Sequence, residues 1–259
     1  MDLRLTGKVA LVTGSSRGIG AAIAEGLAAE GCDMMLTGRD EAALKEVAAS
    51  IVKRGRKAQI STLDLADPKA PAALVADLKK HFGKLDILVN NAGATKRGDF
   101  RELTDADWKD GFELKFFAHV RLAREAWPLL VASKGSVVTI AGIAGKEPEA
   151  EFGIGSSVNA ACVAWSKALA DVGKKEGVQV NAINPGRVET ERLWRRIRTR
   201  VQAGETEAAV RTDMLKQFNI TRFGLVEDIA GLIAFMASPQ GRWLHGTTID
   251  MDGGEVRGV

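Results

Sequence analysis

The sequence predicts an α/β protein built on one parallel sheet that is covered by helices on both faces. Short, continuously apolar segments alternate with segments of helical pattern along most of the chain, which is typical of strands buried on both faces. A glycine-rich turn, residues 14–20, joins the first apolar segment to the first helical one. Because parallel strands are joined by right-handed crossovers, the fold class is a single doubly wound sheet.

The predicted strands follow one another at short intervals. They are Val9–Val12, Met34–Leu36, Ala58–Leu63, Ile87–Val89, Val137–Ile140 and Val178–Ile183. Helical patterns lie between them, among them 21–30, 41–53, 105–133 and 159–175. No linker, repeat or low-complexity tract interrupts the series, so residues 1–259 are expected to form a single domain.

One stretch, residues 188–217, departs from this alternation. It is charged, helical in composition and lies between two segments that resemble sheet core. In a doubly wound fold, an insertion after the carboxyl end of a strand lies over the ligand crevice. We therefore expect a small helical substrate lid here. The alternative is a solvated helical excursion.

Composition argues against several classes of protein. With 36 Lys and Arg against 33 Asp and Glu, the net charge is only +3, which does not favour nucleic-acid or membrane binding. No apolar run approaches the ~20 residues of a membrane span, and the N-terminus lacks the apolar core of a signal peptide. Cys32, Cys162 and the three histidines show no ligand spacing, so no metal site is expected. These features fit a cytoplasmic protein.

The glycine-rich turn is the first candidate binding site. Its sequence is Thr13-Gly14-Ser15-Ser16-Arg17-Gly18-Ile19-Gly20. Glycines there let the backbone turn sharply and approach a pyrophosphate, while the following helix offers N–H groups and the positive end of its dipole. A tight structural turn is the alternative, but the position between a strand and a helix favours dinucleotide binding.

Three further segments carry recognisable motifs. They are Asn90-Asn91-Ala92-Gly93, Asn184-Pro185-Gly186-Arg187-Val188-Glu189-Thr190 and Gly246–Gly254. With the glycine turn, they resemble the NNAG, PGxxxT and final-strand segments of the short-chain dehydrogenase/reductase family, notably its 3-oxoacyl-acyl-carrier-protein reductases, over residues 7–254. The resemblance implies a Rossmann-type fold, oxidoreductase activity and a homodimer or homotetramer. It also implies cofactor contacts from Gly14, Ser16, Arg17, Gly18, Ile19, Gly20, Arg39, Asp64, Leu65, Asn91, Ala92, Gly93, Pro185, Gly186, Val188 and Thr190.

The end of the second strand indicates which cofactor is bound. An NAD site places a carboxylate there to bond the ribose 2′-hydroxyl, whereas this chain has Gly38 at that position. A 2′-phosphate would meet no repulsion, and Arg39 and Arg17 could pair with it. Asp40 is expected to cap the next helix. The sequence therefore favours NADP over NAD, although binding of both stays open.

The positions that carry catalysis in the resembling family are all replaced. Its tyrosine, lysine, serine and asparagine correspond to Gly155, Asn159, Gly142 and Lys115, and the thirteen-residue spacing from serine to tyrosine is kept without a gap. The chain contains no tyrosine at all. We therefore expect the usual tyrosine and lysine mechanism to be absent.

Two residues are candidates for a replacement role. Lys115, desolvated in the vacated pocket, could act as an acid or polarise a carbonyl, and Asn159 could bond the nicotinamide ribose. Alternatively, Lys115 only restores a lost structural hydrogen bond. His119 lies one turn later, where packing is the simpler interpretation. A rival alignment that uses Lys167 as the active lysine would need a deletion inside a helix.

The run Arg192 to Arg200 is the only strong charge cluster. Its arginines are expected to spread around a helix, while Leu193, Trp194 and Ile197 pack inward. A solvated helix, an anion-recognising lid and a nucleic-acid surface are the three interpretations, and the rest of the chain offers no patch that would support the last.

Two functions remain as hypotheses. The first is an NADP-dependent short-chain oxidoreductase with an atypical active site, acting on a carbonyl or hydroxyl group of a small molecule, acyl-linked or anionic. The alternative is an NADP(H)-binding pseudoenzyme that acts through regulation or partners.

Overall fold

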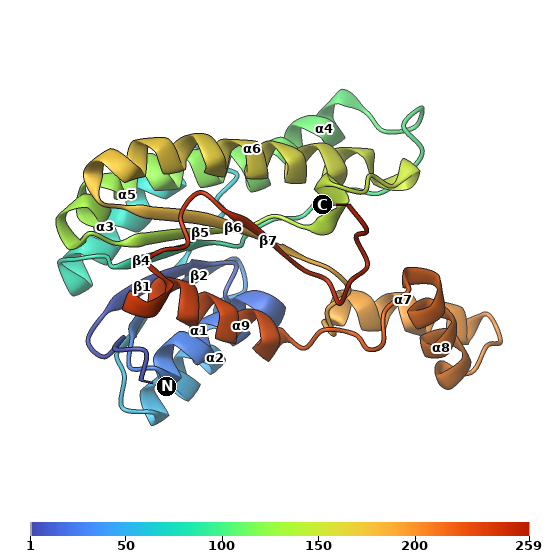
Figure 1. Cartoon of the computed structure of the whole chain (residues 1–259), viewed down its shortest axis with the longest axis horizontal. Coiled ribbons are helices and arrows are strands. Elements are labelled where there is room, and N and C mark those ends of the chain that lie inside the picture. Colours follow the sequence, from blue (N-terminus) through green and yellow to red (C-terminus); the bar gives the residue numbers. More distant parts are fainter. Residues whose placement is uncertain (1, 259) are drawn as a thin grey trace.

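The structure, a computed structural model, describes residues 2–258 and confirms the doubly wound sheet (Figure 1). All strand pairs are parallel, and the order across the sheet is β3-β2-β1-β4-β5-β6-β7. The strands are β1 (Val9–Thr13), β2 (Asp33–Gly38), β3 (Ala58–Thr62), β4 (Ile87–Asn90), β5 (Ser136–Ile140), β6 (Gln179–Pro185) and β7 (Thr248–Met251). Each strand predicted from the sequence is present.

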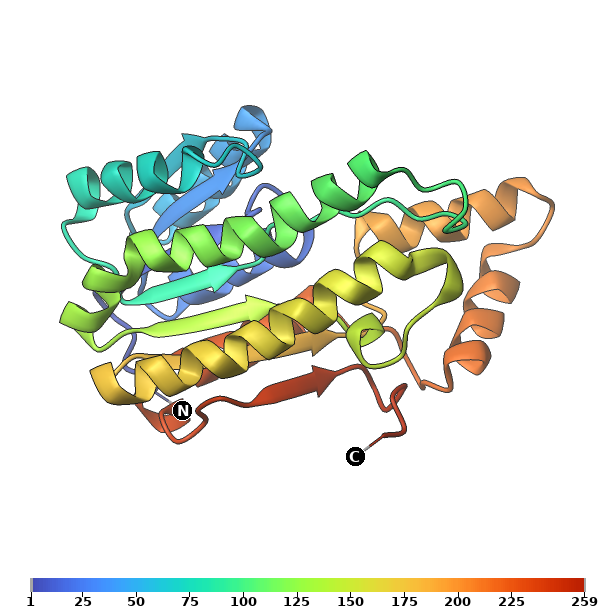
Figure 2. The same cartoon turned by 90° about the horizontal axis from the view of Figure 1, so that it is seen from above.

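Helices cover both faces of the sheet. Helices α1, α2 and α9 lie on one face, and α3, α4, α5 and α6 lie on the other (Figures 1 and 2). Their bounds are α1 (Gly18–Ala29), α2 (Glu41–Lys53), α3 (Ala70–Phe82), α4 (Asp105–Phe112), α5 (Ala118–Ser133), α6 (Gly153–Glu176), α7 (Glu191–Gln202), α8 (Glu207–Phe218) and α9 (Val226–Ala237). Short helices are η1 (Glu113–Phe117), η2 (Ile143–Gly145), η3 (Ala150–Phe152) and η4 (Pro239–Gly241).

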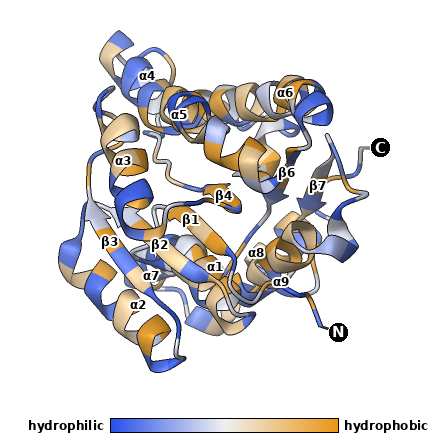
Figure 3. Ribbon diagram, turned by 90° about the vertical axis from the view of Figure 1, so that its left-hand side faces the viewer, coloured by the Kyte–Doolittle hydropathy of each residue, from blue (hydrophilic) through white to orange (hydrophobic). Residues whose placement is uncertain are grey.

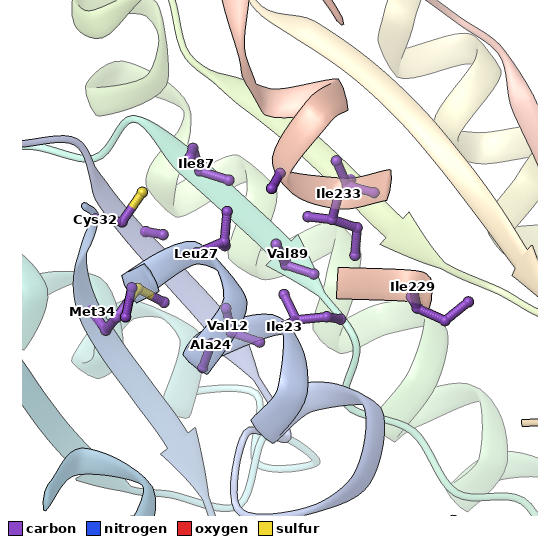
Figure 4. Close-up of a cluster of buried hydrophobic side chains, with 14 of the residues drawn as sticks. Val12, Ile23, Ala24, Leu27, Cys32, Met34, Ile87, Val89, Ile229 and Ile233 are labelled. Carbon is purple, nitrogen blue, oxygen red and sulfur yellow. The ribbon is translucent and has the colours of Figure 1, made fainter. Parts of the chain in front are cut away.

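The sheet separates two apolar cores. Figure 4 shows the core under α1 and α9, where Ile23 and Leu27 of α1 meet Val12, Val89 and neighbouring side chains. The opposite core joins α3, α5 and α6 to the other face of the same strands. In Figure 3, β1 and β4 are mainly hydrophobic, which agrees with strands buried on both faces.

Local capping explains where several elements begin. The side chain of Asp40 accepts a hydrogen bond from the Ala43 N–H at 3.1 Å, which confirms its predicted role as the cap of α2. At the other end of a helix, Gly177 adopts a left-handed conformation with φ of 81° and ends α6.

Two helical predictions need correction. The expected helix 105–133 is not uniform, because residues Glu113–Phe117 form a π-helical segment between α4 and α5. Helix α6 begins at Gly153 rather than at residue 159. A π segment adds one residue to a turn, and such bulges occur often at functional sites.

The charged stretch 188–217 forms the helical pair α7 and α8 beyond the carboxyl edge of the sheet, on the right of Figure 1. Leu193 and Ile197 of α7 pack with Val210 and Met214 of α8 in a small core of their own. Among the described residues, no helix combines the length and the apolar character needed to cross a membrane.

Candidate active site

A cleft of about 1000 Å³ opens at the carboxyl ends of the strands. It lies where the chain switches direction between β1 and β4, the place where doubly wound sheets bind ligands. All the residues proposed from the sequence as cofactor contacts line it: Gly14, Ser16, Arg17, Gly18, Ile19, Gly20, Arg39, Asp64, Leu65, Asn91, Ala92, Gly93, Pro185, Gly186, Val188 and Thr190.

The glycine turn is shaped so that a side chain would not fit. A Cβ atom on Gly20 would lie 2.2 Å from the carbonyl oxygen of Gly14, and Gly14 itself has φ of 64°. Helix α1 begins at Gly18 with no acidic residue in its first turn and no side-chain cap within residues 2–258. Its first N–H groups are therefore available to an anion such as a pyrophosphate.

A polar brace holds this turn against the end of β4. The Thr13 hydroxyl accepts hydrogen bonds from the N–H groups of Asn91 and Ala92, at 2.8 and 2.9 Å. The side-chain amide of Asn91 donates to the carbonyl oxygens of Thr13 and Gly14. Asn91 therefore lines the cleft, while its amide nitrogen fixes the shape of the turn.

Strand β2 ends at Gly38, so no carboxylate stands at the position that would meet the ribose, and the cationic Arg39 follows directly. A Cβ atom on Gly38 would have its nearest neighbour, the Ser16 hydroxyl oxygen, at 3.4 Å. Arg39 approaches Asp64 at 3.8 Å, with both side chains at least half exposed. A surface pair of this kind is weak, so Arg39 is free to turn toward a bound phosphate.

The opposite end of the cleft is centred on Lys115, in the π-helical segment. Its ammonium donates to the carbonyl oxygen of Ala141 at 2.9 Å and to the Asn159 side-chain oxygen at 2.6 Å. Burial in the cleft wall is the main cause that lowers the pKa of Lys115 to about 8; Cys162 opposes the shift, and the positive charge of Arg192 contributes to it. The stem of Lys115 packs on Gly93, where a Cβ atom would lie 2.7 Å from the Lys115 Cδ.

The other three positions that the sequence spacing matches to the family's catalytic residues lie in the same cleft. Gly142 follows β5 and faces Asn159, whose side-chain nitrogen would be 3.0 Å from a Cβ on Gly142. Gly155 lies in the first turns of α6, and the Phe152 ring occupies the space above it, 2.1 Å from the position of a Cβ. No sequence motif indicates the position of the Phe152 ring, because the ring reaches this place only through the short helix η3.

The histidine and lysine alternatives do not line the cleft. His119 is buried, and its Nε2 bonds the Ala92 carbonyl oxygen at 2.8 Å. Burial lowers the pKa of His119 to about 3, so the ring is neutral and holds the chain after β4 in place. Lys167 donates instead to the Gly246 carbonyl oxygen at 2.9 Å, away from the cleft.

The arginines of α7 spread around the helix, as expected from the sequence, and three of them reach the cleft. Arg192, Arg195 and Arg196 line the cleft, because spacings of three and four residues place them on one face of the helix. Arg198 pairs with Glu191, and Arg200 pairs with Glu205 and Asp213. The cluster is therefore divided between the cleft and the outer surface.

An ion-pair chain, which sequence reasoning missed, borders the same end of the cleft. Arg97 pairs with Glu149, Glu149 with Arg187 at 3.2 Å, and Arg187 with Glu255 at 2.7 Å. Arg97 also stacks on the Phe152 ring, with its guanidinium carbon 4.4 Å from the ring centre. Burial alone would raise the pKa of Glu149, but the two arginines outweigh it and lower that pKa. Within residues 2–258, no group of three or more His, Cys, Asp or Glu side chains could hold a metal ion.

Known proteins resemble this chain over nearly its full length. A family model described as short chain dehydrogenase matches residues 8–201. The 3-oxoacyl-(acyl-carrier-protein) reductase FabG of Salmonella typhimurium is 31% identical over 249 residues, covering 96% of this chain and 97% of the relative.

Solved structures also resemble this chain over nearly its full length. L-sorbose reductase from Gluconobacter frateurii, complexed with NADPH and L-sorbose, has a TM-score of 0.97 and 33% identity, with 100% of both chains covered. A short chain dehydrogenase from Burkholderia cenocepacia in complex with NADP has a TM-score of 0.86 and 34% identity, covering 97% of this chain and 99% of that one. The chain described here belongs to the short-chain dehydrogenase family.

Proposed function

We propose that this protein is an NADPH-dependent oxidoreductase that reduces a carbonyl group, with Lys115 in place of the missing tyrosine as proton donor. One observation carries the proposal. The chain has no tyrosine, and Lys115 is the titratable side chain whose lowered pKa lies near neutrality in the cleft. Enzymes shift pKa values toward the working pH at the groups that transfer protons.

The cleft fits NADP. The Gly14 to Gly20 turn leaves no space for side chains and exposes the N-terminus of α1, as a pyrophosphate requires. Gly38, Arg17 and Arg39 favour a 2′-phosphate over a free hydroxyl. Structural relatives that are 33 and 34% identical were solved with NADPH and with NADP. When bound, NADPH supplies the hydride.

Lys115 is suited to supply the proton. An ammonium has three N–H donors, and Ala141 and Asn159 accept two of them. The third can be donated to a substrate oxygen in the cleft. On reduction of the carbonyl, that oxygen would gain negative charge, and the Lys115 proton would move to it and leave a neutral amine. A positioned general acid typically contributes 10²–10⁴ in rate.

Asn159 positions Lys115. Its side-chain oxygen holds the ammonium at 2.6 Å and is itself buried, so the lysine has one preferred orientation in the cleft. Its side-chain nitrogen remains for the nicotinamide ribose, in the place where the related enzymes use a lysine.

Replacement of Lys115 by Met tests the role of its ammonium. The methionine keeps an unbranched chain against Gly93 but removes the charge. NADPH oxidation is measured across ketones, acyl thioesters and quinones, and the expected loss is about 100-fold or more in kcat. Lys109→Met, on the exposed side of α4, is the matched control. Turnover that survives Lys115→Met while Lys109→Met is normal would eliminate Lys115 as the acid.

A second function is supported by the Phe152 ring. This ring fills the space above Gly155, so the place where a family tyrosine would project is closed. A protein that binds NADP(H) without turnover, and acts through regulation or partners, would also have such a site. Tight NADPH binding, followed by the fluorescence of the five tryptophans, with no turnover of any substrate class would favour this function.

Three wider features belong to the same proposal. Residues 188–217 act as a substrate lid, because α7 presents its first two turns to the cleft. The chain assembles as a homodimer or homotetramer, since Phe117, Val172 and Trp243 leave apolar surface exposed near α5, on α6 and before β7. It acts in the cytoplasm, where the two free, buried thiols stay reduced. Light scattering that gives a monomer at micromolar concentration would refute the assembly.

A further inference from the structure

The reaction end of the cleft carries an excess of positive charge. Six cationic side chains line it: Arg97, Lys115, Arg187, Arg192, Arg195 and Arg196. Arg97 and Arg187 are neutralised by Glu149 and Glu255. In the part of the chain that the structure describes, the guanidinium groups of Arg192, Arg195 and Arg196 have no hydrogen-bond or ion-pair partner. Their donors are therefore unused and face the open cleft.

The helix itself holds these arginines in place. Leu193 and Ile197, on the neighbouring face of α7, are buried against α8. The first two turns of α7 cannot rotate without exposing this apolar pair, so Arg192 and Arg196, one turn apart, stay directed at the cleft. A helix that was only solvated would not require its arginines to be held in a fixed direction.

The charges also repel one another. Shielding from solvent, and then the neighbouring Arg97 and Arg195, lower the pKa of Arg192. Shielding, Arg187 and Arg97 likewise lower the pKa of Arg196, against smaller opposite effects of Glu149 and Glu255. An anion seated among these groups would remove the repulsion and use the free donors. Arginine forks match the geometry of carboxylate and phosphate oxygens.

The position of the cluster separates it from the phosphate end of the cofactor site. That end lies at the N-terminus of α1, with Arg17 and Arg39 beside it. Arg192 instead lies close enough to Lys115 for its charge to affect the ammonium, and Arg97 stacks on Phe152 at the same end. The unpaired arginines therefore face the substrate side.

We propose that the substrate carries an oxyanion group, a carboxylate or a phosphate, that is bound by Arg192 and Arg196. The part of this inference that places the reacting carbonyl at Lys115 rests on the proposed function. The anion site itself does not, because it would exist in a binding protein as well.

Calorimetry on the NADP-saturated protein tests the anion site without any need for turnover. Two matched pairs of probes are used: acetoacetate with methyl acetoacetate, and dihydroxyacetone phosphate with dihydroxyacetone. The first pair tests a carboxylate and the second a phosphate. In at least one pair, the anion should bind about tenfold or more tightly than its neutral partner, as charge-assisted hydrogen bonds are lost in the latter.

Arg192→Gln and Arg196→Gln should each weaken anion binding about tenfold. Arg124→Gln, a charge-matched change of an exposed side chain on α5 outside the cleft, should leave it unchanged. Because the two variants relieve repulsion, their Tm should be equal to or above that of the wild type, which separates lost binding from lost folding.

Three outcomes would overturn the inference: no preference for either anion, binding that is insensitive to both substitutions, or an equal loss of NADP affinity, which would assign the cluster to the cofactor. Intact anion binding without turnover of any substrate would instead remove the proposed enzymatic function and leave the anion site standing.

Discussion

The two ends of the cleft present different chemical groups to a ligand. At the cofactor end, the Gly14 to Gly20 turn and the start of α1 present backbone N–H groups, and a side chain would only obstruct them. The reaction end instead presents side chains, and they come from the π-helical segment, from α6 and α7, and from the loops after β4, β5 and β6. The first end carries the glycine turn that resembles the family motif, whereas our proposal for the second end does not use the family's catalytic residues.

This difference indicates which residues of such a site can be substituted without damage to the rest of it. A Cβ atom on Gly20 would lie 2.2 Å from the Gly14 carbonyl oxygen, so almost any change there damages the turn. Lys115, by contrast, depends on two acceptors, Ala141 and Asn159, and a side chain of another type can be held by other partners. The chemistry of the chain can therefore diverge while its cofactor site does not.

Restoring the family residues should produce the largest change. We expect Gly142→Ser, Gly155→Tyr and Asn159→Lys to stay inactive as ketone reductases while Phe152 is present, since its ring fills the space above residue 155. With Phe152→Ala added, ketone reduction should rise by about 10²–10⁴. Steady-state NADPH oxidation measures both variants. Equal activity with and without Phe152 would show that the ring does not obstruct the site.

One added methyl group at the cofactor end should strongly weaken NADPH binding. Gly20→Ala places a Cβ atom against the Gly14 carbonyl oxygen, so the turn must open and NADPH affinity should fall by about 100-fold, as several charge-assisted hydrogen bonds to the pyrophosphate are lost. Gly231→Ala, in the exposed middle of α9 with nothing within 4 Å, is the control. It should leave NADPH binding unchanged and stabilise the fold by about 0.5–1 kcal/mol. Similar NADPH affinities for the two variants would contradict the backbone cradle.

Cofactor preference should respond to a charge at the end of β2. Gly38→Asp fits without a steric clash, because the nearest atom to its Cβ is 3.4 Å away. The new carboxylate repels a 2′-phosphate and can bond a free ribose hydroxyl. Fluorescence titration should show NADPH binding weakened about 30-fold, or about 2 kcal/mol, and NADH binding strengthened. Unchanged preference would mean that the adenosine ribose lies elsewhere.

The smallest expected effect concerns pH. Because the pKa of Lys115 is lowered to about 8, its ammonium is the main form below that pH and the neutral amine above it. A proton donor must be charged, so carbonyl reduction should be constant below pH 8 and fall about tenfold per pH unit above it. The reverse oxidation should rise over the same range. A flat profile of kcat in both directions would leave water as the proton source.

Most of the fold could be predicted from the sequence. Strands such as Val137–Ile140 and Ile87–Val89 are short apolar runs whose signal is local, and Asp40 has the residue type and place of a helix cap. The cofactor turn was predictable for the same reason, since its glycines are adjacent in sequence and their spacing follows from backbone geometry.

The reaction end depends on contacts that no local pattern contains. The Phe152 ring reaches Gly155 because residues Ala150–Phe152 form one 3₁₀ turn, and the π-helical segment at Lys115 has no distinctive composition. Spacing alone places Arg192, Arg195 and Arg196 on one side of α7, next to the face that Leu193 and Ile197 bury, but it does not show that this side meets the cleft.

The chain of ion pairs from Arg97 through Glu149 and Arg187 to Glu255 has a mechanical consequence. Its members belong to the segments that follow β4, β5, β6 and β7, so each segment is tied to the next across the edge of the sheet. A molecule that displaces one of these four segments strains the ion pairs to the others. The segments at the rim of the cleft therefore move together or stay in place. Selectivity for shape can then reside in a stiff rim, while the lid role proposed for α7 and α8 would leave substrate entry to that helical pair.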